Sequence, residues 1–154
     1  MSTDQVDARS ALTSDLVTAI DHAGIAVPDL DAAKAFYVEQ LGMEVLHEEV
    51  NEEQGVIEAM LGVRGTPADS TQIQLLAPLN ESSTIAKFID RNGPGLQQLC
   101  VRTSDVDALS DRLRAAGIRL VYETSRRGTA GARINFIHPK DAGGVLMELT
   151  QPAG

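Results

Sequence analysis

The clearest local pattern in the chain is an apolar strand followed by a turn and an amphipathic helix. Residues 19–27 form an apolar run that carries one histidine, His22. Asp29 or Asp31 can cap a helix that begins directly after the turn, because a short acidic side chain accepts hydrogen bonds from the first free amides. Apolar residues then recur at helical spacing. The pattern therefore predicts a strand at 19–27 and a helix near 30–41.

The strand and helix pattern returns 76 residues later, which indicates an internal duplication. At that offset His22 matches Gln98, and near the end of each copy Gln74 matches Glu148 at an offset of 74. Each predicted helix ends in a glycine that is followed by another predicted strand. The period is longer than in solenoid repeats, so we expect two copies of one strand–helix–strands module rather than an array.

The remaining apolar and polar runs complete the two modules. Further strands are expected at 44–48, 56–61, 71–77, 96–102, 118–123, 133–138 and 144–150, further helices at 84–92 and 105–116, and loops at 49–54 and 125–131. We expect a flexible N-terminal tail at 1–18 and a single α+β domain at 19–151. The domain consists of module one (19–78), a connector with a helix (79–94) and module two (95–151).

Four side chains with metal-ligand atoms occupy equivalent positions in the two modules. His22 and Gln98 lie on the first strands, and Gln74 and Glu148 lie on the last strands. If the modules pair about a twofold axis, matched strands lie side by side and the four donors meet. One imidazole and three oxygen donors with a single negative charge suit Mn, Co, Ni or Mg better than a structural Zn site. Ordinary alternation of polar and core positions along strands explains the spacing equally well.

Two carboxylates stand in otherwise apolar predicted strands, Glu58 and Glu148. Burial of an unpaired carboxylate is costly, so Glu148 is expected to contact a cation. Glu58 is the candidate general base, and an ordinary solvent-facing glutamate is the alternative.

Four basic residues stand out in module two: Arg126, Arg127, Arg133 and Lys140. They are candidates for binding phosphates or a carboxylate, because guanidinium and ammonium groups pair with such anions. A solvated basic surface is the alternative.

The composition excludes several classes of protein. The net charge is −9, from 13 basic and 22 acidic residues, which disfavours nucleic acid as a partner. Five aromatic residues and no tryptophan disfavour a stacking platform. No apolar run is long enough to cross a membrane, and no signal peptide is evident. Cys100 is the single cysteine, which excludes an internal disulfide, and we expect a cytoplasmic protein.

Five segments also carry a resemblance to a known family. They are IDHAGIAVPDLDAAKAFY (20–37), HEEVNEEQGVIEAML (47–61), TQIQLLAP (71–78), STIAKF (83–88) and GARINFIHPKDAGGVLMEL (131–149). The chain resembles the vicinal oxygen chelate (glyoxalase/bleomycin-resistance/dioxygenase) superfamily and, within it, the methylmalonyl-CoA epimerase family. The first segment is common to the superfamily, whereas EEQGVxEAML and RINFIHPK are more specific to the epimerases.

The resemblance implies paired βαβββ modules that form an open, cup-shaped mixed sheet around a divalent metal. The metal is usually cobalt, with Mn, Ni, Mg and Zn as the other candidates. By position, the ligands would be His22, Gln74 and Glu148, with Gln98 as the fourth. The implied enzyme is a homodimer that interconverts (2R)- and (2S)-methylmalonyl-CoA through a metal-stabilised enolate. Glu58 and Glu148 would be its two acid/base groups, and the four basic residues of module two would bind the CoA.

Module two departs from the family pattern at one ligand position. Family members commonly carry two consecutive histidines where this chain has Gln97 and Gln98, and the second histidine binds the metal. An amide oxygen is a weaker donor than imidazole. Two alternatives therefore stay open. One is another metalloenzyme of the superfamily, such as a glyoxalase-type isomerase or an epimerase of a related acyl-CoA. The other is a metal-free small-molecule-binding protein, against which the low aromatic content counts.

Overall fold

The computed structural model describes residues 16–154. The strands are β1 (Val17–Ala26), β2 (Glu44–Asn51), β3 (Val56–Gly62), β4 (Gln72–Pro78), β5 (Gly95–Thr103), β6 (Arg126–Arg127), β7 (Arg133–Ile137) and β8 (Met147–Gln151). The helices are α2 (Leu30–Ala35), α3 (Thr84–Asn92) and α4 (Val106–Ala115), with helical turns η1 (Phe36–Gln40), η2 (Thr129–Gly131) and η3 (Pro139–Asp141). The predicted tail lies outside the described residues except at its end, where Leu16 is buried and β1 already begins. No helix within 16–154 is long and apolar enough to span a membrane.

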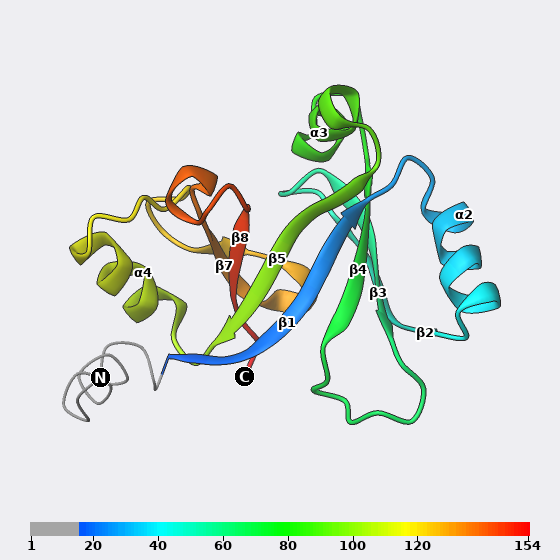
Figure 1. Ribbon diagram of the computed structural model, residues 1–154, viewed down its shortest axis with the longest axis horizontal. Helices are drawn as coiled ribbons and strands as arrows, with labels where there is room; N and C mark the ends of the chain where they lie inside the picture. The colour runs from blue at the N-terminus through cyan, green and yellow to red at the C-terminus, as the bar shows by residue number, and fades with distance from the viewer. Residues whose placement is uncertain (1–15) are drawn as a thin grey trace.

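The eight strands of the described chain form one mixed sheet in the order β2-β3-β4-β1-β5-β8-β7-β6. Strand β1 pairs in parallel with β4 and antiparallel with β5, and β5 pairs in parallel with β8. The order is therefore symmetric when each strand of module one is exchanged for its counterpart in module two. Figure 1 shows β1 and β5 side by side at the centre, with α2 and α4 on opposite outer sides. The predicted α+β fold of two paired modules is confirmed.

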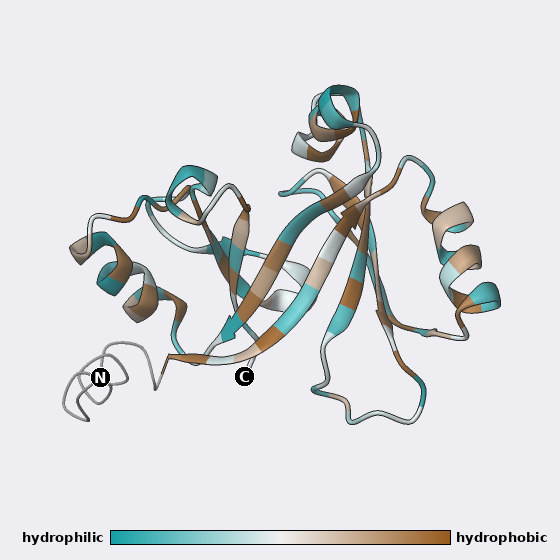
Figure 2. Ribbon diagram, viewed as in Figure 1, coloured by the Kyte–Doolittle hydropathy of each residue, from teal (hydrophilic) through white to brown (hydrophobic). Residues whose placement is uncertain are grey.

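Alternation along the strands gives the sheet an apolar outer face and a more polar inner face. Helix α2 covers the outer face of module one, where Leu30 and Leu75 belong to one buried cluster. Helix α4 covers module two, where Leu109 packs in a cluster with Leu149. Figure 2 shows the alternating hydrophobic and hydrophilic bands along β1 and β5. Because successive strand side chains point to opposite faces, the polar residues between these core positions are directed away from the helices.

The edge strand β2 is longer than predicted. Its strand conformation continues to Asn51, so the acidic segment expected as a loop at 49–54 is partly strand. The turn that follows is fixed by Asn51, whose side-chain oxygen accepts a hydrogen bond from the backbone amide of Gln54 at 3.1 Å. Polar and charged side chains on this strand are typical of an exposed sheet edge.

The predicted strand at 118–123 is wrong. In this segment Leu120 forms a single isolated bridge to β7. The side-chain amide of Asn135 accepts from the backbone nitrogen of Tyr122 and donates to its carbonyl oxygen, both at 3.0 Å. These side-chain bonds replace the backbone ladder, which ends there. The second strand of module two is instead β6, two residues inside the loop predicted at 125–131.

Candidate metal and proton-transfer site

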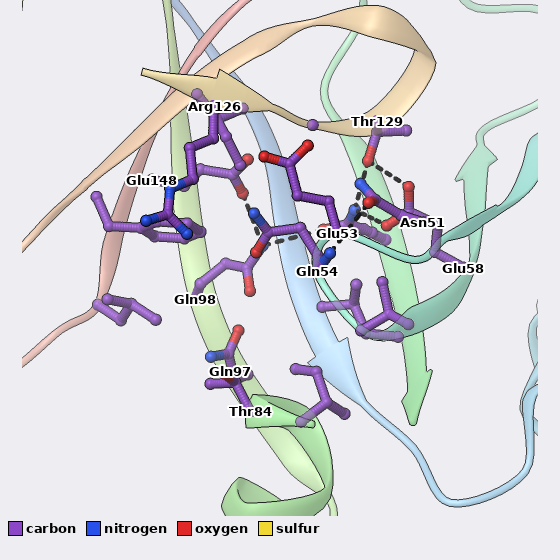
Figure 3. A pocket seen from close by; sticks show the side chains of 18 of the residues that line it. Asn51, Glu53, Gln54, Glu58, Thr84, Gln97, Gln98, Arg126, Thr129 and Glu148 are labelled. Atoms are coloured by element: carbon purple, nitrogen blue, oxygen red, sulfur yellow. Dashed lines mark hydrogen bonds between the residues drawn. The ribbon is translucent and has the colours of Figure 1, made fainter. Parts of the chain in front are cut away.

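A cavity of about 360 Å³ opens on the inner face of the sheet. Both modules line it, with apolar walls that include Val56, Leu76 and Ile134. Its polar groups come from β2 and the turn after it, from β3, β4, α3, β5 and β8, and from β6 with the segments on either side of it. Figure 3 shows the labelled Glu58 and Gln98 reaching the same space from different strands.

The four predicted donors lie together beside this cavity. The amide nitrogen of Gln98 donates to Gln74 Oε1 at 3.0 Å and to Glu148 Oε1 at 2.7 Å. The same oxygen of Glu148 lies 3.2 Å from His22 Nε2. All four side chains are buried, although none of them is apolar. The duplication thus places its matched polar residues in one cluster, as the strand pairing requires.

The strand register explains how two glutamine side chains fit into this cluster. Gly24 of β1 is paired with Gln74 of β4 on one side and with Gln98 of β5 on the other. A Cβ atom at Gly24 would lie 2.7 Å from Cδ of Gln98, which is closer than packed atoms tolerate. The space that glycine leaves at position 24 is therefore filled by the side chain of Gln98.

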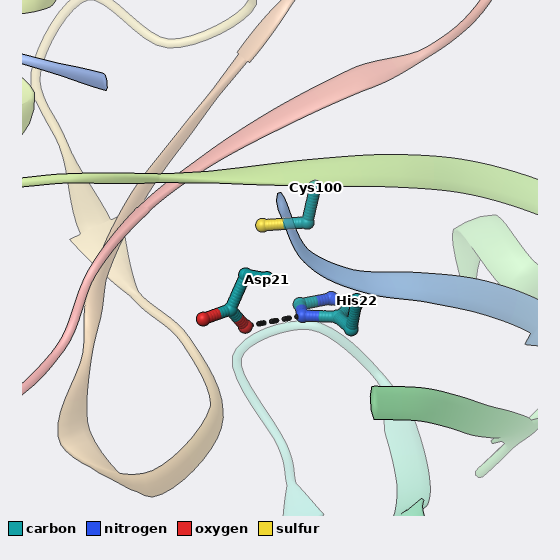
Figure 4. A group of neighbouring side chains, drawn as sticks. All are labelled: Asp21, His22 and Cys100. Carbon is teal, nitrogen blue, oxygen red and sulfur yellow. Dashed lines mark hydrogen bonds and ion pairs between the residues drawn. The ribbon is translucent and has the colours of Figure 1, made fainter. Parts of the chain in front are cut away.

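A second layer of charged groups orients His22. Its Nδ1 lies 2.7 Å from Asp21 Oδ2 (Figure 4). Arg102 Nε donates to the other Asp21 oxygen at 2.7 Å. A carboxylate on Nδ1 fixes the tautomer and directs Nε2 toward Glu148. Cys100 lies in the same group, with its ligand atom within 4.8 Å of those of Asp21 and His22. We interpret Asp21 as a support for the ligand, because Arg102 already pairs with it.

Glu58 lies next to the donor cluster. One of its oxygens accepts from Gln74 Nε2 at 2.9 Å, and the other accepts from the Thr129 hydroxyl at 2.5 Å. Burial raises the pKa of Glu58 to about 7, although the hydrogen bond from Thr129 favours the charged form. The nearby carboxylates of Glu49 and Glu148 also raise it. A carboxylate with this pKa can both take up and release a proton near neutral pH.

The chemistry of the cluster fits a divalent metal. The Gln98 amide hydrogens are directed at Gln74 Oε1 and Glu148 Oε1, so a partial positive charge already lies among the candidate metal-ligand atoms. Burial alone would lower the pKa of His22, but hydrogen bonds to Asp21 and Glu148 outweigh it and raise the pKa to about 9. The surroundings therefore stabilise positive charge. Imidazole, carboxylate and the oxygens that both glutamine amides carry suit Co, Mn, Ni or Mg.

The four basic residues predicted to bind CoA occupy different surroundings. Arg126 lines the cavity, and its guanidinium carbon lies 4.1 Å from the ring centroid of Tyr122. Arg127, Arg133 and Lys140 are exposed and are not among the residues that line the cavity. A role for these three would therefore be limited to parts of a ligand outside the cavity.

Three contacting residues were not singled out from the sequence: Asp21, Arg102 and Thr129. The register of β1 shifts between Ile20 and His22, so the adjacent Asp21 reaches the histidine instead of pointing to the opposite face. Thr129 lies in the basic, glycine-containing loop, where the sequence offered no signal for a contact with β3.

Comparison with known proteins identifies the family of the chain. Residues 21–136 match the Glyoxalase/Bleomycin resistance protein/Dioxygenase superfamily. This match covers most of the chain, and the chain belongs to that superfamily.

Relatives of known structure and name narrow the class. The crystal structure of methylmalonyl-CoA epimerase from Mycobacterium tuberculosis is 61% identical, with a TM-score of 0.86 and 96% of each chain covered. A variant of the Streptomyces coelicolor methylmalonyl-CoA epimerase in complex with 2-nitronate-propionyl-CoA is 47% identical, with a TM-score of 0.84 over 90% of this chain and 99% of that one. The ethylmalonyl-CoA/methylmalonyl-CoA epimerase of Cereibacter sphaeroides is 37% identical over 88% of this chain and 99% of its own length. Within the superfamily, the chain is a member of the methylmalonyl-CoA epimerase family of enzymes.

Proposed function

We propose that this protein interconverts (2R)- and (2S)-methylmalonyl-CoA by removing and returning the α-proton of the substrate. The observation that carries the proposal is the position of Glu58, a buried carboxylate with a pKa of about 7, beside a cluster of metal-ligand donors. Support also comes from relatives, one of which is a methylmalonyl-CoA epimerase in complex with methylmalonyl-CoA and NH4+.

In this mechanism Glu58 takes the α-proton from one face of the substrate. Thr129 and Gln74 hold its two oxygens by hydrogen bonds, so the carboxylate is fixed before the substrate arrives. Glu148 exchanges a proton on the opposite face. A buried base with a pKa near the working pH contributes roughly 100- to 10,000-fold to the rate.

His22, Gln74, Gln98 and Glu148 would hold the divalent metal, for which cobalt is our first candidate. When bound, the metal would act as a Lewis acid that stabilises negative charge developing on the thioester oxygen. Asp21 keeps the Nε2 atom of His22 available for this role by bonding Nδ1.

Arg126 is the basic residue of the described cavity lining and would pair with an anionic group of the substrate. The cavity of about 360 Å³ suits the acyl end of the thioester, which leaves the nucleotide of CoA outside. There it would meet Arg127, Arg133 or Lys140. We further propose that the enzyme is a cytoplasmic homodimer.

The test uses purified protein and each epimer of methylmalonyl-CoA separately in deuterated water. The protein is assayed as isolated, after a chelator, and after re-addition of Co²⁺. We expect epimerisation with solvent deuterium at the α-carbon, lost with the chelator and restored by Co²⁺. Exchange with a different malonyl thioester only would mean that the enzyme has another substrate and uses the same proton-transfer chemistry. Absence of exchange at every metal loading would reject the enzyme in favour of a metal-free binding protein.

A further inference from the structure

The two ends of the sheet are joined by a side chain that the mechanism above does not use. Strands β2 and β6 are the terminal strands of the sheet order. Glu49 of β2 accepts a hydrogen bond from the backbone nitrogen of Ala130 at 2.5 Å, in the turn η2 that follows β6. The side chain of Glu49 is only 15% exposed, although it lies on an edge strand. This contact closes the open side of the sheet next to the cavity.

The residue that Glu49 contacts has an unusual backbone. Ala130 has φ 55° and ψ 34°, and it is the one non-glycine residue with positive φ in the described part of the chain. A residue with a Cβ atom in this left-handed region costs roughly 1–3 kcal/mol and persists only where its surroundings hold it. The hydrogen bond that the Ala130 amide donates to the Glu49 carboxylate is such a restraint.

The strained turn presents Thr129 to the active carboxylate. The Thr129 hydroxyl donates to Glu58 at 2.5 Å and accepts from Gln74 Nε2 at 3.0 Å. Thr129 directly precedes Ala130, so the backbone held by Glu49 is the backbone that aims this hydroxyl. A chain of contacts therefore links Glu49 of β2, through the backbone of Ala130 and the hydroxyl of Thr129, to the carboxylate of Glu58.

The surroundings of Glu49 favour its charged, bonded state. His47 Nε2 lies 2.7 Å from the oxygen that Ala130 contacts, and Arg127 Nη2 lies 3.9 Å from the other oxygen. The third charged neighbour is the carboxylate of Glu58. The two carboxylates repel each other, and the charge of Glu49 raises the pKa of Glu58. A second bridge supports the same closure, because the Tyr122 hydroxyl donates to Gln54 Oε1 at 3.2 Å.

We propose that Glu49 is a positioning residue, which latches the loop at 128–131 onto β2 and thereby holds Thr129 against Glu58. The catalytic consequence rests on the proposed epimerase function. The latch itself is a property of the fold that is measured without substrate.

The experiment compares wild-type protein with Glu49→Ala, Glu49→Gln and Glu48→Ala. Glu48 is the matched control, since it is the neighbouring acidic residue on the same strand and pairs with Lys34 instead of the loop. Glu49→Gln keeps a side-chain oxygen that can accept from Ala130 and removes only the charge. Hydrogen–deuterium exchange of the Ala130 amide, followed by NMR, reports the latch, and far-UV circular dichroism reports folding.

We expect the Ala130 amide to be protected in the wild type and in Glu48→Ala. Glu49→Ala should raise its exchange rate at least about tenfold, because a broken bond opens the turn locally. The same variant should lower kcat roughly tenfold with KM within about twofold, because misplacement of a catalytic group affects turnover more than binding. Glu49→Gln should retain most of the protection and most of kcat.

Several results would overturn the latch. An unprotected Ala130 amide in the wild type would do so without any variant, even if Glu49→Ala failed to fold. Loss of protection in Glu49→Ala with unchanged kcat would remove the positioning role. An equal loss of kcat in Glu48→Ala would do the same. If the wild type shows no epimerisation, the proposed function fails, and the Ala130 amide still decides the latch.

Discussion

The amide nitrogen of Gln98 lies 2.7 Å from Oε1 of Glu148, so the two candidate ligands of module two, one on β5 and one on β8, are in direct contact. A neutral amide stands where family members commonly have an imidazole. Because an amide oxygen is a weaker metal ligand than imidazole, we expect Gln98 to limit the affinity of the proposed metal site.

Replacing this amide by imidazole should strengthen metal binding. We expect Gln98→His to lower the dissociation constant for Co²⁺ by roughly tenfold, since imidazole is a preferred ligand of this ion. Isothermal titration calorimetry of metal-free protein measures it. Gln40→His is the control, because it adds an imidazole on an exposed turn far along the chain. Equal affinities for the wild type and Gln98→His would place residue 98 outside the metal site.

Gly24 should be intolerant of a side chain. The added Cβ of Gly24→Ala would lie 2.7 Å from Cδ of Gln98, so one of the two must move. We expect a loss of about 1–3 kcal/mol in unfolding free energy, as is usual for overpacking, together with weaker metal binding. Chemical denaturation measures the stability. The double variant Gly24→Ala with Gln98→Ala should recover most of it, because the clashing atoms are gone; a double variant less stable than Gly24→Ala would contradict this packing.

Asp21 should tune the metal site without touching the metal. Asp21→Asn weakens the bond that fixes the His22 ring, and changes of this kind typically cost 10- to 100-fold in metal affinity. The measurement is a competition titration with a chromophoric chelator. Asp107→Asn, an exposed change on α4, is the control. Unchanged affinity in Asp21→Asn would show that the ring is held by packing alone.

Glu58 should make the metal-free protein less stable as the pH rises. Its pKa is about 7 in the folded protein against a usual value of 4.5, so the folded state holds the proton more tightly than the unfolded chain. The unfolding free energy therefore falls between these two pH values, and the loss is complete above pH 7.

Glu58→Gln removes this charge and its pH dependence. At pH 8 the variant should be more stable than the wild type by up to about 3 kcal/mol, and the difference should disappear toward pH 4.5. Thermal and urea denaturation in the presence of a chelator check this. A variant that is less stable than the wild type at pH 8 would mean that Glu58 is charged and well stabilised in the fold.

The duplication made much of the fold and site predictable. Matching His22 with Gln98 and Gln74 with Glu148 required only that equivalent strands pair about a twofold axis, and β1 and β5 do so. Glu58 stood out for a simple physical reason: it is a carboxylate in an apolar strand.

The remaining features depend on irregularities that the hydrophobic pattern does not encode. Asp21 reaches His22 only because the register of β1 shifts beside it. The strand expected at 118–123 is lost to the side chain of Asn135, which replaces backbone partners. Thr129 is aimed at Glu58 by Ala130, and an alanine gives no sequence signal for positive φ.

The most direct test of the central claim is α-proton exchange by Glu58→Gln. The metal-loaded variant and the wild type are incubated with each methylmalonyl-CoA epimer in deuterated water, and deuterium at the α-carbon is followed by mass spectrometry. Our account predicts that the variant binds metal as the wild type does but no longer interconverts the epimers, and that exchange is lost for at least one of them. Near-normal exchange from both epimers would contradict the account and remove Glu58 from the role of base.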